Sequence, residues 1–207
     1  MHFLKGTESF VRCKVVKPKE IAMEDMQKEL LANSFSSRNI SPNAEEVFGW
    51  VDPSNCLKEP QLSDMILEPH IRFTMRVDKK KIPSALMEAH YEIEESATLA
   101  AEGKEKLSVG RKRDLRRQVK DMLILQTSPT TQLYRGIYNY STHELLIFNT
   151  SNSIIKKFAK LFTESFGVEV MQLTPWSLGY TWARKNKRKN KFAETEPMKL
   201  VRKKNDS

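Results

Sequence analysis

The sequence contains few of the residues on which several classes of protein depend. Among 207 residues there are two cysteines, seven glycines and four histidines. Cys13 and Cys56 are too few and too far apart for a disulfide framework or a zinc site, so we expect two reduced thiols. The glycines form neither a phosphate-binding loop nor a dinucleotide-binding motif, and no nucleophile elbow of a serine hydrolase is present. We therefore predict neither a bound metal nor a cofactor.

Long apolar segments are also missing. No window approaches the roughly 18 consecutive apolar residues that a transmembrane helix needs. The N-terminal segment lacks the apolar run of a signal peptide, and no lipidation signal accompanies the basic residues. These absences predict a cytoplasmic protein without a membrane partner.

Positive charge is abundant, and it is unevenly distributed along the chain. There are 35 basic against 26 acidic residues, a formal net charge of +9. Residues 180–207 contain 10 basic and 3 acidic residues, which leaves 25 against 23 in residues 1–179. Because residues 180–207 have little apolar material to bury, we expect them to be a disordered, polycationic tail behind a folded region, 1–179. A tail that only keeps the chain soluble is the alternative.

Hydrophobic periodicity predicts alternating strands and helices in the folded region. β-Branched and aromatic runs indicate strands, and apolar residues at intervals of three and four indicate amphipathic helices. The predicted strands are residues 10–16, 47–51, 70–77, 132–140, 144–149 and 168–173, and the predicted helices are 19–35, 83–102, 104–125 and 154–167. Phe48 and Trp50 are expected to anchor the core. This order is typical of an α+β fold with mixed or antiparallel sheets.

Two of the helices are expected to form an antiparallel hairpin at about residues 83–126. Pro83 stands at the start of the first helix, where its missing N–H is tolerated, and Gly103 lies at the turn. The apolar residues of the first helix are spaced to form one buried stripe. They are Leu86, Ala89, Ile93, Ala97 and Ala100. Such a hairpin would project from the sheet as an arm.

The second helix of this hairpin is basic on one face and apolar on the other. At about 100° per residue, the apolar face comprises Leu115, Val119, Met122 and Leu123. The opposite face holds Arg113, Arg116, Arg117 and Lys120. Crowded cations repel one another, and a polyanion relieves this repulsion while releasing its own counterions. The alternative is an ordinary solvated face.

Aromatic residues offer a second kind of contact with nucleic acid. Tyr134, Tyr138 and Tyr140 lie at even offsets, so one face of a predicted strand presents all three. Bases could stack on such a face if it were open, but packing into the core is the favoured interpretation. Trp176 and Trp182 lie beside the basic tail and contact either the folded body or a nucleic acid.

A metal-dependent nuclease is the enzymatic alternative. Such an enzyme needs two or three carboxylates that converge on a divalent cation, often beside a lysine. Glu102-Gly103-Lys104 has the Glu-x-Lys spacing of one nuclease motif, but it lies at a predicted helix end rather than on a strand. Glu88, Glu92 and Glu95 share a helix face that we expect to be solvated. We therefore predict a protein without catalytic activity.

Several segments, taken in order, also occur in a known family. The sharpest is Phe48-Gly49-Trp50-Val51-Asp52-Pro53, which the helix start Lys81-Ile82-Pro83 and the basic helix ending Val119-Lys120-Asp121 follow. The others are Phe3-Leu4-Lys5 before Phe10, the strand pair from Leu133 to Asn149, Ser151-Asn152-Ser153 with Phe158, Ala159 and Leu161, and Val170-Met171-Gln172-Leu173-Thr174-Pro175. In order and spacing the chain resembles the bacterial recombination-associated RdgC family. On this resemblance we expect a shortened member without the family's usual C-terminal region. Residues 125–130 stand where the family has a Leu-Leu-Pro-Arg-Ala-Phe segment after the basic helix.

The resemblance implies a nucleoid-associated protein that binds DNA with little sequence preference, forms a ring-shaped dimer around duplex and restrains the RecA recombinase. Together with the charge pattern, it leads us to expect a sequence-tolerant DNA-binding protein of the nucleoid that binds duplex DNA, with binding to single strands left open. A homodimer and competition with a RecA-type recombinase are further expectations. The alternative from another class is an interaction module whose basic surface docks an acidic protein.

The predicted DNA contacts are basic residues of the basic helix and of the tail. They are Arg111, Lys112, Arg113, Arg116, Arg117, Lys120, Arg184, Lys185, Lys187, Arg188, Lys189 and Lys191. Arg72 and Arg76, on the wet face of predicted strand 70–77, are additional candidates.

Overall fold

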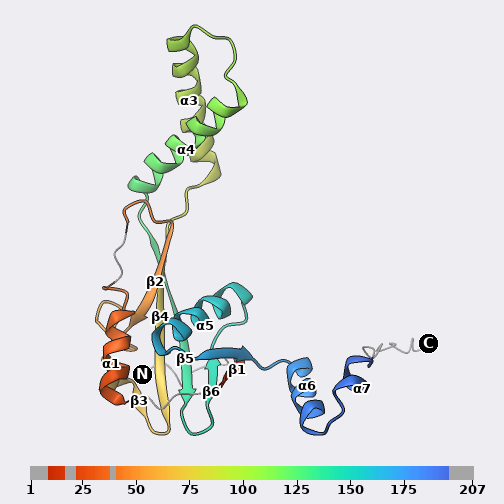
Figure 1. Ribbon diagram of the computed structural model, residues 1–207. Coiled ribbons are helices and arrows are strands. Elements are labelled where there is room, and N and C mark those ends of the chain that lie inside the picture. Colours follow the sequence, from red (N-terminus) through yellow and green to blue (C-terminus); the bar gives the residue numbers. More distant parts are fainter. Residues whose placement is uncertain (1–8, 17–21, 38–40, 196–207) are drawn as a thin grey trace, which may run out of the picture.

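The chain folds around one curled antiparallel sheet, which confirms the predicted α+β class (Figure 1). The computed structural model describes residues 9–16, 22–37 and 41–195. The sheet has seven strands in the order β2-β4-β5-β6-β1-β7, with β3 paired to β4. The predicted helix residues 19–21, the Phe3-Leu4-Lys5 segment and tail residues 196–207 lie outside the described residues.

The elements follow the predicted order, with short additions between β2 and β4 and after β7. The strands are β1 (Val11–Val16), β2 (Glu46–Val51), β3 (Ile66–Leu67), β4 (His70–Lys79), β5 (Thr130–Asn139), β6 (Glu144–Ile147) and β7 (Glu169–Gln172). The helices are α1 (Met23–Ala32), α2 (Leu62–Met65), α3 (Ser84–Glu102), α4 (Val109–Gln126), α5 (Asn152–Phe166), α6 (Pro175–Lys185) and α7 (Lys189–Ala193).

The main core lies between the sheet and α5. Phe158 of α5 meets Trp50 of β2 edge to face, with ring centroids 5.1 Å apart, and both side chains are fully buried. The indole N–H of Trp50 donates a hydrogen bond of 2.8 Å to the Ser165 hydroxyl, so burial leaves this donor satisfied. Gly136 of β5 is needed here because a Cβ at this position would lie 2.5 Å from the Phe158 ring. Trp50 is thus the core anchor that the sequence predicts.

Other predicted core residues also lie inside. Tyr138 is buried against α5, and Tyr134 and Tyr140 pack against the same core, so this strand face is not an open stacking surface. Both cysteines are free thiols, as predicted. Cys13 is buried in β1, and burial raises the pKa of its thiol to about 11.

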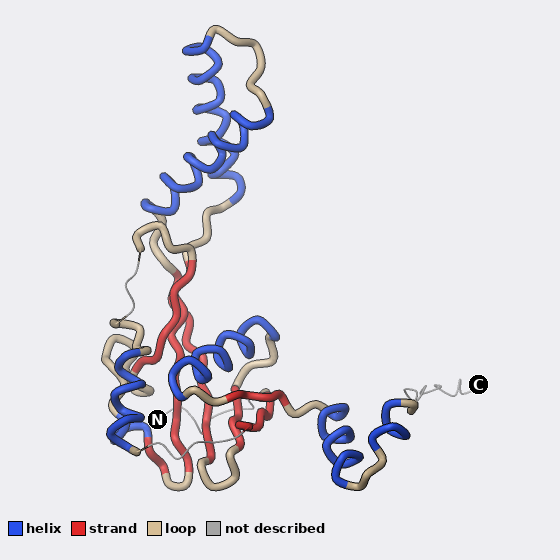
Figure 2. The backbone as a smooth tube through the Cα atoms, in the orientation of Figure 1, coloured by secondary structure: helices blue, strands red, loops and turns tan. Residues whose placement is uncertain are grey.

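The helical hairpin, α3 and α4, is an insertion between two neighbouring strands. β4 and β5 pair along ten residues, and their ladder ends at Lys79 and Thr130, where the chain leaves for the hairpin and returns from it. The helices therefore project beyond one end of the sheet, as the strands in Figure 2 lead up to them. The hairpin has a small core of its own, made by Tyr91, Leu107 and Leu115.

The buried stripe predicted for the first hairpin helix is wrong. Leu86 and Ile93 are 44% and 65% exposed, whereas Tyr91, on another face, is 5% exposed. The contact face of α3 instead follows Glu88, Tyr91 and Glu95, because Tyr91 packs into the hairpin core and the two carboxylates pair with cations of α4. The face predicted to be solvated thus lies against α4, and the apolar stripe faces solvent.

The start of the basic helix also differs from the prediction. The helix begins at Val109 rather than at Lys104, with Ser108 as its N-cap and the Ser108 hydroxyl accepting from the Arg111 N–H at 3.3 Å. Leu107 lies in the hairpin core, which holds the preceding segment in a non-helical path. On α4 itself Leu115, Val119 and Leu123 are buried as predicted.

Residues 180–195 were expected to be disordered, but the structure shows them largely helical. Thr174 and Ser177 form a reciprocal capping box that starts α6, with Pro175 at the first helical position. Ala183 is fully buried, and the Phe192 ring lies against Gly179, so α7 packs back on α6. The prediction failed because the capping box, Pro175 and the packing of Phe192 on α6 support a helix pair although Trp176 and Trp182 stay exposed. The pair follows β7 and stands apart from the sheet (Figure 1).

Candidate nucleic-acid interface

The predicted DNA contacts fall into two separate regions, with a third group on the sheet. One region is the α3–α4 hairpin, and the other is the α6–α7 unit, which we define as residues 175–195. Figure 1 shows the two regions projecting from different ends of the molecule. Arg72 and Arg76 lie on β4 of the sheet.

Most cations of α4 already have a carboxylate partner. Four of these partners lie on other segments or at the hairpin turn, and one lies on α4 itself. The pairs are Arg111–Glu102 at 3.3 Å, Lys112–Glu95 at 2.8 Å, Arg116–Glu88 at 3.0 Å, Arg117–Asp114 at 2.7 Å, and Lys120 with Glu45. The Arg116 guanidinium also lies 4.6 Å from the centre of the Tyr91 ring. The basic face predicted from helical spacing is therefore largely neutralised.

The charge of the hairpin as a whole agrees with this pairing. Residues 84–126 contain eight basic and eight acidic residues, a net charge of zero. The hydrogen bond from Lys112 lowers the pKa of the Glu95 carboxyl, and the same contact raises the pKa of Lys112, so both groups stay charged at neutral pH. Arg113 is exposed and has no ion pair with any residue that the structure describes. Arg113 is thus the one α4 cation of the predicted set left open to a phosphate.

The Glu102-Gly103-Lys104 segment is a helix-ending turn. Gly103 takes the left-handed conformation, with φ of 60°, which ends α3. Glu102 pairs with Lys104 at 2.8 Å and with Arg111, and the hydrogen bond from Lys104 lowers the pKa of the Glu102 carboxyl. Throughout residues 9–16, 22–37 and 41–195, no group of three or more His, Cys, Asp or Glu side chains could hold a metal ion. The carboxylate of this segment is therefore engaged by cations at its own turn.

The two β4 arginines have partners within the fold. Arg76 forms a two-pronged ion pair with Asp78, at 2.8 Å and 2.6 Å, and its guanidinium lies 4.2 Å from the centre of the Phe35 ring. The hydrogen bonds that Arg76 donates to the Asp78 carboxylate raise the pKa of Arg76. Arg72 donates to the carbonyl oxygen of Asp64 at 2.6 Å. A phosphate would have to displace these contacts.

The α6–α7 unit has the opposite electrostatic character. It contains six of the predicted contacts and a single acidic residue, Glu194, which gives a net charge of +5. The six are Arg184, Lys185, Lys187, Arg188, Lys189 and Lys191. All six are exposed, and none forms an ion pair within the part of the chain that the structure describes. A pocket of about 680 Å³ is lined by five of them together with Asn186 and Asn190.

The same unit contains an aromatic cluster that sequence reasoning did not find. Trp176 and Tyr180 lie one helical turn apart on α6, with ring centroids 5.2 Å apart and ring planes 11° from parallel. Phe192 of α7 approaches both rings, and the Lys189 ammonium lies 5.6 Å from the centre of the Tyr180 ring. The spacing of four residues after Thr174-Pro175 was a usable signal, because it places both rings on one face of a helix.

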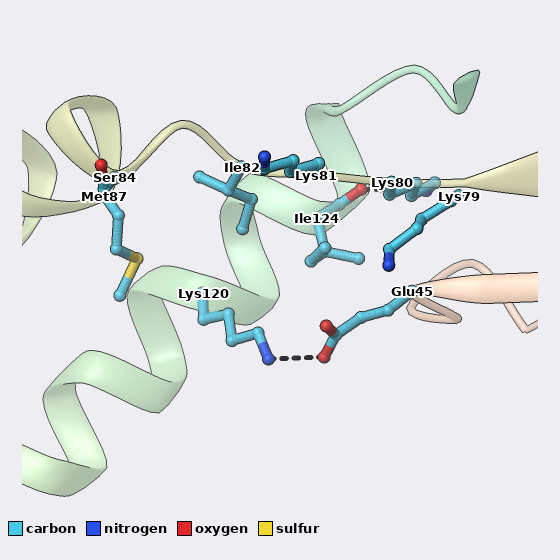
Figure 3. Close-up of a pocket in the computed structure, with 9 residues that line it drawn as sticks. All are labelled: Glu45, Lys79, Lys80, Lys81, Ile82, Ser84, Met87, Lys120 and Ile124. Atoms are coloured by element: carbon cyan, nitrogen blue, oxygen red, sulfur yellow. Dashed lines mark hydrogen bonds and ion pairs between the residues drawn. The ribbon is translucent and has the colours of Figure 1, made fainter. Parts of the chain in front are cut away.

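A group of lysines at the base of the hairpin was also missed, although Lys79-Lys80-Lys81 is a visible run. These lysines line a pocket of about 480 Å³ together with Lys120 and Glu45 (Figure 3). The Lys80 ammonium donates to the carbonyl oxygens of Pro42 and Ile124, at 2.9 Å each, and so ties the end of α4 to the sheet. In Figure 3 the Lys120 and Glu45 side chains point toward one another.

Comparisons with family models and with curated proteins give no indication of function, so the proposed function depends on the chain's own residues. No family model matches this chain, and no curated protein matches it. Among the described helices, none is both long and apolar enough to cross a membrane.

Proposed function

We propose that this chain is a sequence-tolerant DNA-binding protein that reads the charge of the phosphate backbone. The observation that carries the proposal is the α6–α7 unit, where six exposed cations lack carboxylate partners in the described structure. Unpaired cations on a projecting unit favour a polyanion, because binding removes their mutual repulsion and releases counterions from the DNA. Contacts of this kind position a protein on DNA without selecting a base sequence.

The hairpin has a secondary role in this proposal. Arg113 is available, and exposed ion pairs such as Arg116–Glu88 are worth only about 0–1 kcal/mol. A phosphate can therefore compete for an arginine of α4, but the released carboxylate then repels the DNA. Lys81, at the base of the hairpin, adds a cation beside β4, whereas Lys79 is paired with Glu46 at 3.9 Å.

The biological setting is proposed from the resemblance to the RdgC family. On this basis the protein acts at the nucleoid, binds duplex and single-stranded DNA and restrains a RecA-type recombinase. A homodimer is also proposed, and the exposed apolar side chains of Leu86 and Ile93 on α3 support it, because exposed apolar surface of this kind favours association. Mass by light scattering, with and without DNA, tests the dimer.

Binding to random-sequence DNA over a series of salt concentrations tests the central proposal. We expect mobility shifts that depend little on sequence and weaken steeply with salt. An acidic peptide of equal charge serves as competitor. If the peptide displaced DNA at equal charge concentration, or if DNA did not bind, the chain would instead be a module that docks an acidic protein.

We further propose that the protein binds DNA without cutting it. Labelled linear DNA incubated with the protein and Mg²⁺ or Mn²⁺ is expected to stay intact at concentrations that give full mobility shifts. Glu102→Gln is the matched variant, because Glu102 belongs to the one Glu-x-Lys segment that resembles a nuclease motif. Shortened products that disappear with chelator and with Glu102→Gln would make the protein an enzyme.

A further inference from the structure

The aromatic cluster of the α6–α7 unit presents an open ring face beside cations that form no ion pair with any described residue. Trp176 is 66% exposed although Tyr180 stacks against it, with the ring planes 11° from parallel. Phe192 lies 6.2 Å from the Trp176 ring, centroid to centroid, at an angle of 53°. These neighbours hold the indole in one orientation and leave much of its surface to solvent. A ring that is ordered before binding loses less entropy when a ligand stacks on it.

We propose that this unit binds single-stranded DNA by stacking an unpaired base on Trp176, while neighbouring cations hold the phosphates. The inference rests on the proposed DNA binding and adds a strand preference to it. Lys189, which lies over the Tyr180 ring, joins the aromatic and basic parts of the site. An aromatic platform beside a basic groove is the general arrangement by which proteins bind single strands without sequence preference, because every base has a stacking face. In a duplex the neighbouring base pairs cover those faces, so only an unpaired base can use the ring.

The distribution of exposed apolar residues on α6 favours a nucleic acid over a lipid surface. Trp176 and Trp182 are both exposed but lie six residues apart, which places them about 120° from each other around the helix. Leu178, also exposed, lies on the side of Trp182. A helix that inserts into a membrane surface needs its large apolar residues on one face. Isolated rings on two faces suit planar ligands better.

Trp182 provides a matched control for Trp176. It is 58% exposed, on the same helix and in the same charged unit, but it has no ring contact within the described residues. The two tryptophans are similarly exposed, but only Trp176 stacks on another described ring and has Lys189 near its stacking partner. The proposal therefore predicts that Trp176, and not Trp182, binds a base. Trp176→Leu and Trp182→Leu remove comparable apolar area and leave the charge unchanged.

The experiment measures binding of the full chain to three labelled ligands of equal length: oligothymidine, an abasic strand with the same phosphates, and a duplex. With Trp176→Leu, we expect oligothymidine to bind about tenfold more weakly, since stacking of one base is worth roughly a factor of 5 to 150. The abasic strand and the duplex should change by less than about twofold, because neither offers an unpaired base. Trp182→Leu should change all three by less than about twofold, and Trp176→Phe should retain most of the affinity.

A second measurement does not depend on the stability of α6 in the Trp176→Leu variant. The chain has three tryptophans, and Trp50 is fully buried, so in Trp182→Phe the exposed indole is that of Trp176. Oligothymidine should quench this emission, and the abasic strand should not. Equal quenching by both strands would overturn the stacking proposal.

The remaining outcomes distinguish failure of this inference from failure of DNA binding. In one outcome, the variant with all six cations replaced by Gln binds none of the ligands, whereas Trp176→Leu binds all of them like the parent chain. DNA binding then stands, and the stacking proposal is wrong. If the six-cation variant binds like the parent chain, both proposals fail. Vesicles of phosphatidylcholine and phosphatidylglycerol test the lipid alternative. Vesicle binding that requires Trp176, with unchanged oligothymidine binding, would assign the site to a membrane.

Discussion

The helical hairpin and the α6–α7 unit each contain a cluster of cations, but they differ in how those charges are balanced. The hairpin, residues 84–126, has eight basic and eight acidic residues, whereas residues 175–195 have six basic residues and one acidic residue. In the hairpin, carboxylates of α3 reach across to α4, as in the Lys112–Glu95 and Arg116–Glu88 pairs. The α6–α7 unit has no second acidic helix. A cationic helix face is therefore a strong polyanion site only where the fold does not supply its counterions.

The two regions also differ in the distance over which they attract a phosphate. A phosphate that approaches the α6–α7 unit meets a net charge of +5, and attraction of this kind acts over roughly the Debye length, about 8–10 Å in physiological salt. A phosphate that approaches α4 meets a neutral hairpin and binds favourably only after an ion pair opens. We therefore expect the α6–α7 unit to capture DNA and the hairpin to contribute at short range.

The largest expected effect comes from removing the charge of the α6–α7 unit. Replacement of its six cations by Gln should reduce the slope of log Kobs against log salt by about 5 units, at roughly 0.9 for each phosphate that the variant no longer neutralises. Anisotropy of labelled duplex over a salt series measures this slope. The control variant replaces two exposed cations outside the unit, Lys156 and Lys160 of α5, by Gln. It should change the slope far less. A slope that stays at the parent value would move the DNA surface away from this unit.

The next effect comes from removing the counterions of the hairpin. Glu88→Gln, Glu95→Gln and Glu102→Gln together remove the partners of three α4 cations and give the hairpin a net charge of +3. The three cations are Arg111, Lys112 and Arg116. We expect tighter DNA binding and a slope that is steeper by up to about 3 units.

A charge-matched variant separates this local effect from the overall charge. Glu24→Gln, Asp25→Asn and Glu169→Gln remove three exposed carboxylates from α1 and β7, so the net charge rises equally. Equal gains in affinity for the two triple variants would mean that the hairpin does not touch DNA.

A smaller effect is expected when the hairpin cations themselves are removed. The variant replaces four cations of α4 by Gln: Arg113, Arg116, Arg117 and Lys120. It should reduce the slope of log Kobs against log salt by only about 1 unit, because three of these cations already have carboxylate partners. Arg113→Gln alone should account for most of the change. A reduction of about 3 to 4 units would show that all four cations bind phosphate, at roughly 0.9 for each.

The smallest effect is expected on stability when the α6–α7 unit is deleted. Truncation after Leu173 should shift the thermal midpoint by less than about 2 °C, because the main core cluster lies in earlier residues. Differential scanning calorimetry measures the shift. Trp50→Ala is the contrasting variant. It should lower the free energy of unfolding by about 3–5 kcal/mol, because it leaves a cavity in the core and removes the donor to the Ser165 hydroxyl. A large shift on truncation would mean that α6 stabilises the body.

Much of the fold follows from patterns that act over a few residues. Strand β4 alternates apolar and polar side chains, and α5 repeats its apolar residues every three to four positions, so both were predicted close to their observed bounds. Gly103 and Gly167 end their helices in the left-handed conformation, which is also a local signal. The place of the hairpin between two strands also follows from the sequence order, whereas the pairing of these strands, β4 and β5, was not predicted.

The candidate site was less accessible to sequence reasoning. The predicted cations were identified by residue type. Whether each cation is available to a phosphate depends on carboxylate partners that lie far away in the sequence. Arg116 is 28 residues from Glu88, and Lys120 is 75 residues from Glu45. No spacing rule within one helix reports such pairs. The stripe predicted on α3 was wrong for the same reason, because contacts across the hairpin determined which face lies against α4. They comprise the packing of Tyr91 with Leu107 and Leu115 and the ion pairs of Glu88 and Glu95.

The sequence by itself determined the α+β class, most helix and strand positions and the presence of two cationic segments, because hydrophobic period and composition are local properties. Only the tertiary structure decided which of these segments keeps its charge available. It placed the carboxylates of Glu88 and Glu95 against α4, and it folded the end of the described chain so that Trp176 and Tyr180 stack beside unpaired cations. The physical reason is that electrostatic and stacking energies depend on distances between residues, and chain order does not fix those distances.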